Sequence, residues 1–244
     1  MNKKKLLLFD LDGTLTESGE VMNKDNIITL NNIAQIHDIG IVGGGKFEKI
    51  CDQTNGVKFN YYFSECGCVY HDKNLNIIYK KNIRFHPLYP KINILIKKTL
   101  KFLSEVDYEI TGNFIDLRNG IVYISLIGMS ATATEREKYM YFDNIYNYRK
   151  KLLNILIETA KELGIDKSLH IVQGGSVGIA IYPNENDKIQ ILNILNLEEY
   201  SEIHYFGDKY MPNGNDYLLL NHEKIIGHNI DTVEQTFKIL SHIL

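Results

Sequence analysis

The sequence is short of cysteine, of excess charge and of long hydrophobic runs, and each shortage excludes a class of protein. Its 244 residues include three cysteines, Cys51, Cys66 and Cys68, and this odd number argues against a disulfide framework. The formal net charge of -3 gives no general attraction to nucleic acid or to acidic membranes. No apolar run reaches the roughly 18 residues that a membrane-spanning helix needs. We therefore expect neither a nucleic acid nor a membrane as a partner.

The cysteines, the histidines and the first residues give no sign of a zinc site or a secretory signal. Cys66 and Cys68, in ECGCV, lack the second pair that would complete a zinc site, and the eight histidines show no metal-ligand spacing. The lysines of MNKKK precede an apolar run that is too short for a signal peptide. A cytoplasmic protein is the expectation.

The two ends of the chain alternate short apolar runs with amphipathic segments. Residues 6–9 form a continuous apolar run, as expected of a parallel strand that is covered on both faces. This alternation predicts a doubly wound α/β sheet. The predicted elements are a strand over 6–9, a helix over 26–37, a strand ending in IGIVGGG, a helix in KFEKICDQ, a helix over 187–195, strands in IHYFGD and KIIGH, and a final helix from Asp231.

The middle of the chain has a different pattern, which begins near Pro87 and Pro90. Two short strands joined at Asn119-Gly120 carry a strong hairpin signal. We interpret residues 82–187 as an inserted α+β cap, within a catalytic core formed by 1–81 and 188–244. The predicted elements of the cap are a helix over 92–103, the hairpin at Asn119-Gly120, a helix over 147–163, and two strands that flank Gly174-Gly175.

Two aspartates follow apolar strands at distant points of the sequence. Asp10 ends LLLFD and Asp208 ends IHYFGD. A lone aspartate after a strand is usually a turn or capping residue. In an open parallel sheet, however, the carboxyl ends of the strands meet at one edge, where ligands bind. Three features occur together in this chain, and they favour a ligand site over three separate turns. They are Asp-x-Asp-Gly-Thr, the glycine-rich second turn and GDKYMPNGND.

Phosphoryl transfer through an aspartyl phosphate requires carboxylates in this pattern. Asp10 would be the nucleophile, and Asp12 would handle the proton of the leaving or incoming hydroxyl. Gly13 would allow the chain to turn sharply beneath a bound phosphate.

Magnesium prefers oxygen ligands, and it would offset the charge of a phosphate that lies beside ionised carboxylates. We expect Asp10, the backbone carbonyl of Asp12 and Asp208 as ligands, with Asp216 supporting the metal or its loop. Lys188 is the candidate for a catalytic lysine, although a solvated helix lysine is the ordinary interpretation.

These motifs resemble the haloacid dehalogenase superfamily and, along nearly the whole chain, the eukaryotic-type phosphomannomutases. The resemblance rests on LFDLDGTLT, GIVGGGKFEKI, FIDLRNG, the double glycine before IYP, Asp187-Lys188 and FGDKYMPNGND. It implies a Rossmann-like core with an inserted cap, magnesium dependence, a sugar phosphate as substrate and a homodimer formed through the caps. Members of this family interconvert mannose 6-phosphate and mannose 1-phosphate through a bound sugar bisphosphate.

The resemblance also implies which residues bind the substrate. Arg118, in FIDLRNG, matches a substrate-binding arginine. Gly44 and Gly45 of the second motif and Asn215 of the last motif fall among the phosphate-binding positions. Gly45 replaces a hydroxyl residue but still offers its backbone N–H, and Lys46 beside it adds positive charge.

Several residues that bind substrate in the family are replaced in this chain. A distal phosphate is best bound by arginine side chains, which donate two parallel hydrogen bonds. Arg84, Arg136 and Lys209 are bases without an assigned role, and we expect them to be solvated surface charges. Arginines of the family correspond here to Gly19, Thr111 and Met129, and its serine and aspartate after the double glycine correspond to Gly178 and Ala180.

Three functions are compatible with these observations. A magnesium-dependent phosphatase or phosphotransferase acting on a phosphomonoester fits the retained Asp10, Asp12, Lys188 and Asp208, and the replaced arginines favour it. A true phosphomannomutase is the alternative that similarity along the whole chain supports. A non-catalytic binding or regulatory protein is the third.

Overall fold

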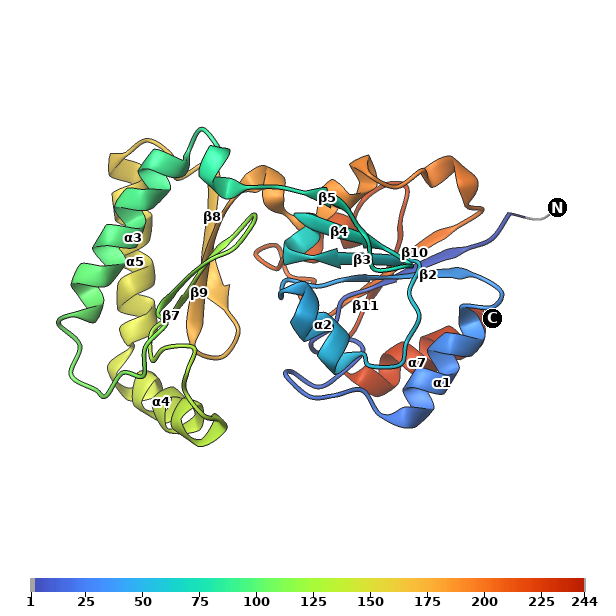
Figure 1. Cartoon of the computed structure of the whole chain (residues 1–244), viewed down its shortest axis with the longest axis horizontal. Coiled ribbons are helices and arrows are strands. Elements are labelled where there is room, and N and C mark those ends of the chain that lie inside the picture. Colours follow the sequence, from blue (N-terminus) through green and yellow to red (C-terminus); the bar gives the residue numbers. More distant parts are fainter. Residues whose placement is uncertain (1–2, 244) are drawn as a thin grey trace. The chain divides into compact units, whose positions relative to one another are not determined.

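The computed structural model describes residues 3–243, and the chain divides into two compact units (Figure 1). Unit 1 contains Met1–Lys81 and Asn186–Leu244, and unit 2 is Asn82–Glu185. The boundary expected at residue 187 falls two residues earlier because Asn186 and Asp187 interact within unit 1. Asn186 accepts a hydrogen bond from Lys81 Nζ at 2.6 Å, and Asp187 caps the turn that contains Lys188.

Unit 1 is built on a seven-stranded sheet in the order β11-β10-β1-β2-β3-β4-β5. The pairs from β11 to β3 are parallel, whereas β4 and β5 are antiparallel additions. The strands are β1 (Leu6–Phe9), β2 (Asp38–Val42), β3 (Tyr61–Ser64), β4 (Val69–Asp72), β5 (Ile77–Lys80), β10 (Ile203–Gly207) and β11 (Ile226–Asn229). The helices are α1 (Lys24–Ile33), α2 (Phe47–Gln53), α6 (Tyr217–Leu220) and α7 (Val233–Ile243), with 3-10 turns η1 (Glu65–Gly67), η4 (Lys188–Asn193) and η5 (Leu197–Glu199).

Apolar side chains leave both faces of this sheet, which explains the unbroken apolar run of β1. Leu7 and Phe9 point to a core that contains Leu30 of α1 and Leu240 of α7. These two helices lie side by side in Figure 1. Leu6 and Leu8 point to the opposite core, with residues of η4 and α6. A strand buried on both faces needs no polar alternation.

The strand order reverses at β1, which lies between β2 and β10. Phe9 pairs with Phe206, and Asp10 donates its backbone N–H to the carbonyl of Phe206 at 2.9 Å. The carboxyl ends of β1 and β10 are therefore adjacent. This is the position at which open parallel sheets bind their ligands.

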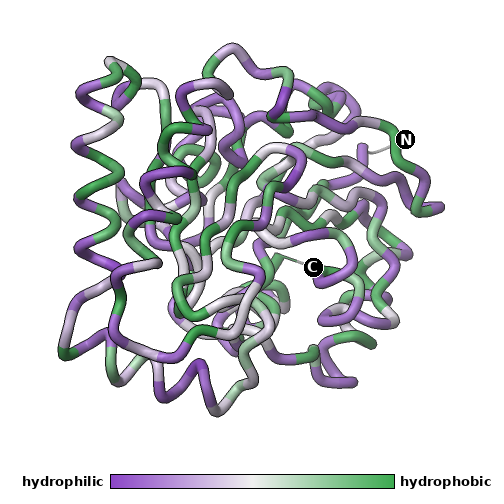
Figure 2. Tube along the Cα trace, turned by 60° about the vertical axis from the view of Figure 1, so that its left-hand side comes forward, coloured by the Kyte–Doolittle hydropathy of each residue, from purple (hydrophilic) through white to green (hydrophobic). Residues whose placement is uncertain are grey.

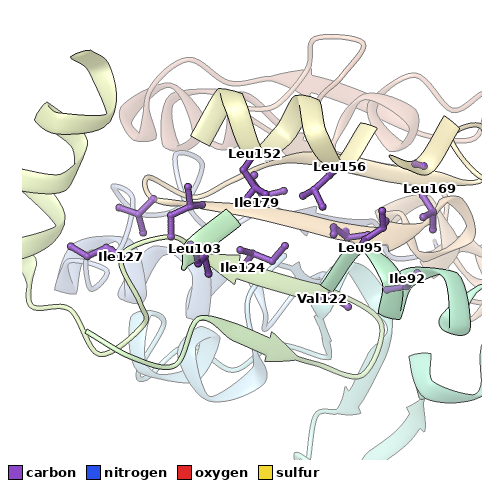
Figure 3. Packing of buried hydrophobic residues seen from close by; sticks show 14 of the residues in the cluster. Ile92, Leu95, Leu103, Val122, Ile124, Ile127, Leu152, Leu156, Leu169 and Ile179 are labelled. Atoms are coloured by element: carbon purple, nitrogen blue, oxygen red, sulfur yellow. The ribbon is translucent and has the colours of Figure 1, made fainter. Parts of the chain in front are cut away.

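Unit 2 is an antiparallel sheet in the order β6-β7-β9-β8 with helices packed against it. Figure 3 shows Leu152 and Leu156 of α5 above Ile179 of β9 and near Ile124 of β7. Hydrophobic and hydrophilic residues alternate along the helices in Figure 2, as expected of helices that bury one face. The elements are η2 (Ile83–Phe85), α3 (Tyr89–Leu103), β6 (Ile115–Leu117), β7 (Val122–Ser125), α4 (Ala133–Tyr146), α5 (Tyr148–Glu162), β8 (Leu169–Gly174), β9 (Gly178–Pro183) and η3 (Asn184–Asn186).

The structure differs from the sequence-based expectations in several elements. A second helix, α4, precedes the predicted helix over 147–163, and Asn147, with a left-handed φ of 55°, separates the two. The segment over 187–195 is a 3-10 turn rather than an α-helix. Strands β3, β4 and β5 were not predicted, because each has only four residues and the three share no common pattern of burial. None of the helices in residues 3–243 has the length and apolar character to cross a membrane.

Candidate active site

Three carboxylates meet at the edge where β1 and β10 end. Asp10 follows β1, Asp208 follows β10, and Asp216 precedes α6. One oxygen atom from each lies within 4.8 Å of the others. The fold thus brings together Asp10 and Asp208, which are far apart in the sequence, as their positions after apolar strands predicted.

Lys188 is fully buried among these carboxylates. Its Nζ contacts Asp10 Oδ1 and donates hydrogen bonds to Asp216 Oδ1 at 2.6 Å and to the Tyr205 hydroxyl at 3.2 Å. Burial lowers the pKa of Lys188, but the Asp10 and Asp216 carboxylates outweigh it and hold the pKa well above its ordinary value. A buried ammonium is tolerated because two carboxylates pair with it.

At Asp10, in contrast to Lys188, the effect of burial on the pKa outweighs that of the opposite charge. Burial, together with the Asp216 and Asp208 charges, raises the pKa of Asp10 to about 7 against the lowering effect of Lys188. Several like charges in one buried place favour protonation of one of them. A cation bound at this edge would favour the ionised carboxylate instead.

Asp216 holds the lysine and the loop after β10 in place. Its side chain is fully buried. Asp216 Oδ1 accepts from Lys188 and from the Tyr205 hydroxyl, and Oδ2 accepts from the backbone N–H of Lys209 at 3.0 Å. With these donors, Asp216 fixes the ammonium of Lys188 beside Asp10.

One carboxylate oxygen of Asp208 is suited to bind a metal ion. Its Oδ1 is buried and has no hydrogen-bond partner within residues 3–243, while Lys209 Nζ contacts Oδ2. Buried polar atoms are normally paired, so an orphaned carboxylate oxygen beside two other carboxylates is suited to a hard divalent cation. Lys209 is thus paired with Asp208 rather than merely solvated.

Gly13 is required by the close approach of Asp208. Its φ is +88°, and a Cβ at this position would lie 2.6 Å from Asp208 Oδ2. The left-handed backbone favours glycine, and the contact excludes any side chain. The structure thus gives Gly13 a role in making room for Asp208.

The carboxylate of Asp12 lies outside the three-carboxylate group and has its own partners. It accepts hydrogen bonds from Lys49 Nζ at 2.8 Å, from Gln53 Nε2 at 3.0 Å and from the backbone N–H of Gly19 at 2.8 Å. Burial raises the pKa of Asp12, but these hydrogen bonds outweigh it and lower the pKa below its ordinary value.

The second and the last motif meet near a left-handed turn. Glu65, Cys66 and Gly67 of η1 all have positive φ, and the N–H groups of Glu65 and Cys66 bond to the carbonyls of Gly45 and Gly43, both at 2.9 Å. Asn215 Nδ2 lies 4.0 Å from Cys66 Sγ, and a Cβ on Gly44 would lie 3.7 Å from Asn215 Nδ2. The structure therefore brings Gly44 and Asn215 together.

The remaining predicted residues of unit 1 lie around α2. A Cβ on Gly45 would lie 3.3 Å from the Lys49 side chain, and the exposed Lys46 is the N-cap residue of α2.

Arg118 belongs to unit 2, where it is fixed by two neighbours. Its Nε donates to Asp116 Oδ2 at 2.8 Å, and its guanidinium lies 4.8 Å from the centre of the Tyr123 ring. Tyr123 is paired with Ala180 across the sheet and donates its hydroxyl to the carbonyl of Gly174 at 3.0 Å. The ring thus lies over the glycines of β8 and β9.

The other bases of unit 2 are engaged or exposed. Arg136 donates to the carbonyls of Ala131 and Met129, both at 3.1 Å, and Arg84 is exposed. Thr111 donates its hydroxyl to the carbonyl of Ile127 at 2.9 Å.

Sequence reasoning missed Tyr205, Lys49 and Gln53. Tyr205 is fully buried in β10, and within an apolar strand it carried no signal beyond its hydroxyl. Lys49 and Gln53 lie in the quoted second motif and its helix, at a spacing of four residues that puts them on one helix face. That spacing was the feature of the sequence from which a shared role of Lys49 and Gln53 could have been predicted.

Comparison with known proteins identifies the family. The eukaryotic phosphomannomutase family profile matches residues 26–244. A phosphomannomutase of Arabidopsis thaliana is 33% identical over 235 residues, covering 95% of this chain and 93% of that protein. One of Dendrobium officinale is 32% identical over 238 residues, covering 94% and 92%.

Solved structures with the same fold are an IMP-nucleotidase and a protein related to a trehalose-6-phosphate phosphatase. An IMP-bound IMP-nucleotidase of Plasmodium falciparum has a TM-score of 0.64 at 13% identity, covering 99% of this chain and 68% of that chain. A trehalose-6-phosphate phosphatase related protein has a TM-score of 0.60 at 16% identity, covering 98% and 96%. At these identities the likeness establishes the haloacid dehalogenase fold alone. The profile match and the relatives show that the chain is an enzyme of the eukaryotic phosphomannomutase family.

Proposed function

We propose that this protein is a phosphomannomutase, which moves a phosphoryl group between the 1- and 6-positions of a hexose through an aspartyl phosphate at Asp10. The observation that carries the proposal is the group formed by Asp10, Asp208 and Asp216 around buried Lys188, in a chain of this family. The replaced arginines favoured a phosphatase at first. Relatives that are over 30% identical along most of the chain support the mutase better.

The chemical steps follow from the positions of the two aspartates. A carboxylate oxygen of Asp10 attacks the phosphorus of a sugar bisphosphate, and the bond from phosphorus to the sugar oxygen breaks. Asp12 gives a proton to that oxygen. In the return step a hydroxyl of the sugar monophosphate attacks the aspartyl phosphate, Asp12 takes its proton, and Asp10 is released.

Magnesium is the cofactor that fits the donor set. The carboxylates of Asp10, Asp208 and Asp216 and the backbone carbonyl of Asp12 would hold it, and the orphaned Asp208 Oδ1 supports this assignment. When bound, the ion supplies positive charge that offsets the phosphate and the carboxylates.

We assign the distal phosphate to Arg118. Asp116 and the Tyr123 ring orient this side chain, and a fixed guanidinium is suited to two parallel hydrogen bonds with a phosphate. A homodimer formed through unit 2 and a cytoplasmic location stay proposals from the resemblance, which light scattering and cell fractionation would test.

The deciding experiment is conversion of mannose 1-phosphate to mannose 6-phosphate with Mg²⁺ and a sugar bisphosphate activator. We expect conversion by the native protein and none by Asp10→Asn. Arg118→Ala should raise the KM for the sugar phosphate and leave that for an aryl phosphate unchanged.

The alternative outcomes of this experiment are distinct. Release of inorganic phosphate without conversion to the isomer would favour the phosphatase. The replaced substrate-binding residues support that alternative; they are Thr111, Met129, Gly178 and Ala180. Binding of sugar phosphate without either reaction would favour the non-catalytic protein. Conversion that survives Asp10→Asn would contradict the proposed nucleophile.

A further inference from the structure

The side chain of Asp12 is held by donors from α2 and from the loop after β1. Lys49 Nζ binds Oδ2, while Gln53 Nε2 and the Gly19 N–H bind Oδ1. Both carboxylate oxygens are therefore engaged, and the rotamer is fixed from two sides. Asp10, two residues earlier, contacts Lys188 instead.

Gln53 ties this arrangement to the segment after β1. It is only 3% exposed. Besides Asp12, its Nε2 lies 3.3 Å from Thr16 Oγ1 and 3.1 Å from the carbonyl of Glu20, and the backbone carbonyl of Gln53 accepts from Met22 N–H at 2.8 Å. The position of α2 thus determines where the Asp12 carboxylate lies.

The ion pair between Lys49 and Asp12 is not explained by folding stability. The Lys49 side chain is 47% exposed and that of Asp12 is 35% exposed. Ion pairs at such exposed places contribute little to the free energy of folding. Proton transfer, in contrast, requires a carboxylate that is held within hydrogen-bond reach of the reacting oxygen.

We propose that Lys49 and Gln53 are positioning residues, which hold the Asp12 carboxylate where it exchanges the proton of the attacking or leaving hydroxyl. This inference rests on the proposed function. It assigns a catalytic purpose to the face of α2 that carries Lys49 and Gln53. Within residues 3–243, the contacts of these two side chains include none with Asp10, Asp208 or Asp216.

The first test compares three variants in mannose 1-phosphate conversion. Lys49→Met should lower kcat about 10- to 100-fold and change KM less than about threefold, because misplacing a catalytic group costs up to about 10²-fold. Lys49→Arg keeps the charge and should restore most of the lost rate. Lys58→Met, an exposed lysine beyond α2, is the matched control and should behave as the native protein.

The second test separates the two proton-dependent steps by leaving group. With 2,4-dinitrophenyl phosphate the leaving phenolate needs no proton, so phosphorylation of Asp10 does not depend on Asp12 as an acid. Lys49→Met should therefore retain a rapid burst of about one phenolate per active site, followed by slow turnover, because the acceptor hydroxyl or water still needs a base.

Gln53 is tested by a pair of variants that differ in charge. Gln53→Glu places a carboxylate against Asp12 and should lower kcat more than Gln53→Met. Because Gln53 is buried, thermal unfolding of both variants must be measured, and the comparison is made below their unfolding temperatures.

The outcomes separate this inference from the proposed function. A native protein that gives neither conversion nor a burst would overturn the proposed function itself. An active native protein with Lys49→Met within twofold of its kcat, or with Lys49→Arg as impaired as Lys49→Met, would overturn the positioning role alone.

Discussion

At the scale of single residues, Asp10 and Asp12 have different environments although one leucine separates them. Asp10 is buried beside Lys188, and burial raises its pKa to about 7. Asp12 is partly exposed, and its hydrogen bonds lower its pKa. A cation bound at the strand ends would reverse this balance, because it would favour the ionised carboxylate that the proposed nucleophile requires.

Replacement of Gly13 should separate backbone strain from the contact with Asp208. Gly13→Ala adds a left-handed alanine, which costs about 1–2 kcal/mol, and also a Cβ 2.6 Å from Asp208 Oδ2. Gly164→Ala has a similar positive φ of 64° with nothing within 4 Å, so it is the matched control. We expect similar strain in both, but a loss of activity of at least about tenfold in Gly13→Ala alone. Denaturant unfolding and the conversion assay measure the two effects, and full activity of Gly13→Ala would contradict this role.

The sharp turn at Gly13 was predictable from the sequence, but its contact with Asp208 was not. Asp-x-Asp-Gly after an apolar strand indicates a sharp turn at a strand tip. The approach of Asp208 to Gly13 depends on the pairing of β10 with β1, two strands that are far apart in the sequence.

At the scale of elements, β10 and β11 contain a histidine pair that the sequence did not indicate. His204 Nδ1 and His228 Nε2 are 2.9 Å apart, and His204 Nε2 lies 3.2 Å from Glu202. Burial, with the neighbouring His204 charge, lowers the pKa of His228 to about 4. Burial also lowers the pKa of His204.

Acid should therefore destabilise unit 1 through these strands. Because the folded pKa of His228 is below the unfolded value of about 6.5, its stabilising contribution is present above pH 6.5 and is lost as the pH falls toward 4. His228→Gln should make the free energy of unfolding less dependent on pH between 6.5 and 4. Chemical denaturation at several pH values measures this, and equal slopes in native and variant protein would contradict it.

The elements that sequence reasoning predicted best are those with a strong local pattern. The apolar strand at 6–9, the hairpin at Asn119-Gly120 and the helix over 92–103 all appear, since the spacing of their side chains depends on near neighbours alone. The separation of α4 from α5 at Asn147 was missed, and so were strand β3 and the antiparallel strands β4 and β5. A single left-handed residue and strands of only four residues leave a weak pattern in the sequence.

At the scale of the whole molecule, ligand binding and stability are linked. A cation that binds the folded carboxylates and not the unfolded chain adds about 2.7 kcal/mol at 100 times its Kd. We expect Mg²⁺ to raise the unfolding temperature of the native protein and EDTA to reverse the rise. Asp208→Asn should show a much smaller rise, and an equal rise in both proteins would remove Asp208 from the metal site. Calorimetry at matched ionic strength is the measurement.

The sequence by itself determined that acids follow two buried strands, as in the motifs LFDLDGTLT and FGDKYMPNGND, and from this it predicted the residues of the candidate site. It also determined the α/β class, and it predicted an inserted segment in the middle of the chain. Only the tertiary structure decided the partners: Lys188 with Asp10 and Asp216, Tyr205 with Asp216, and Lys49 with Asp12. Motifs depend on residues a few positions apart, whereas these contacts depend on strand order and on helix placement, which join segments up to 178 positions apart.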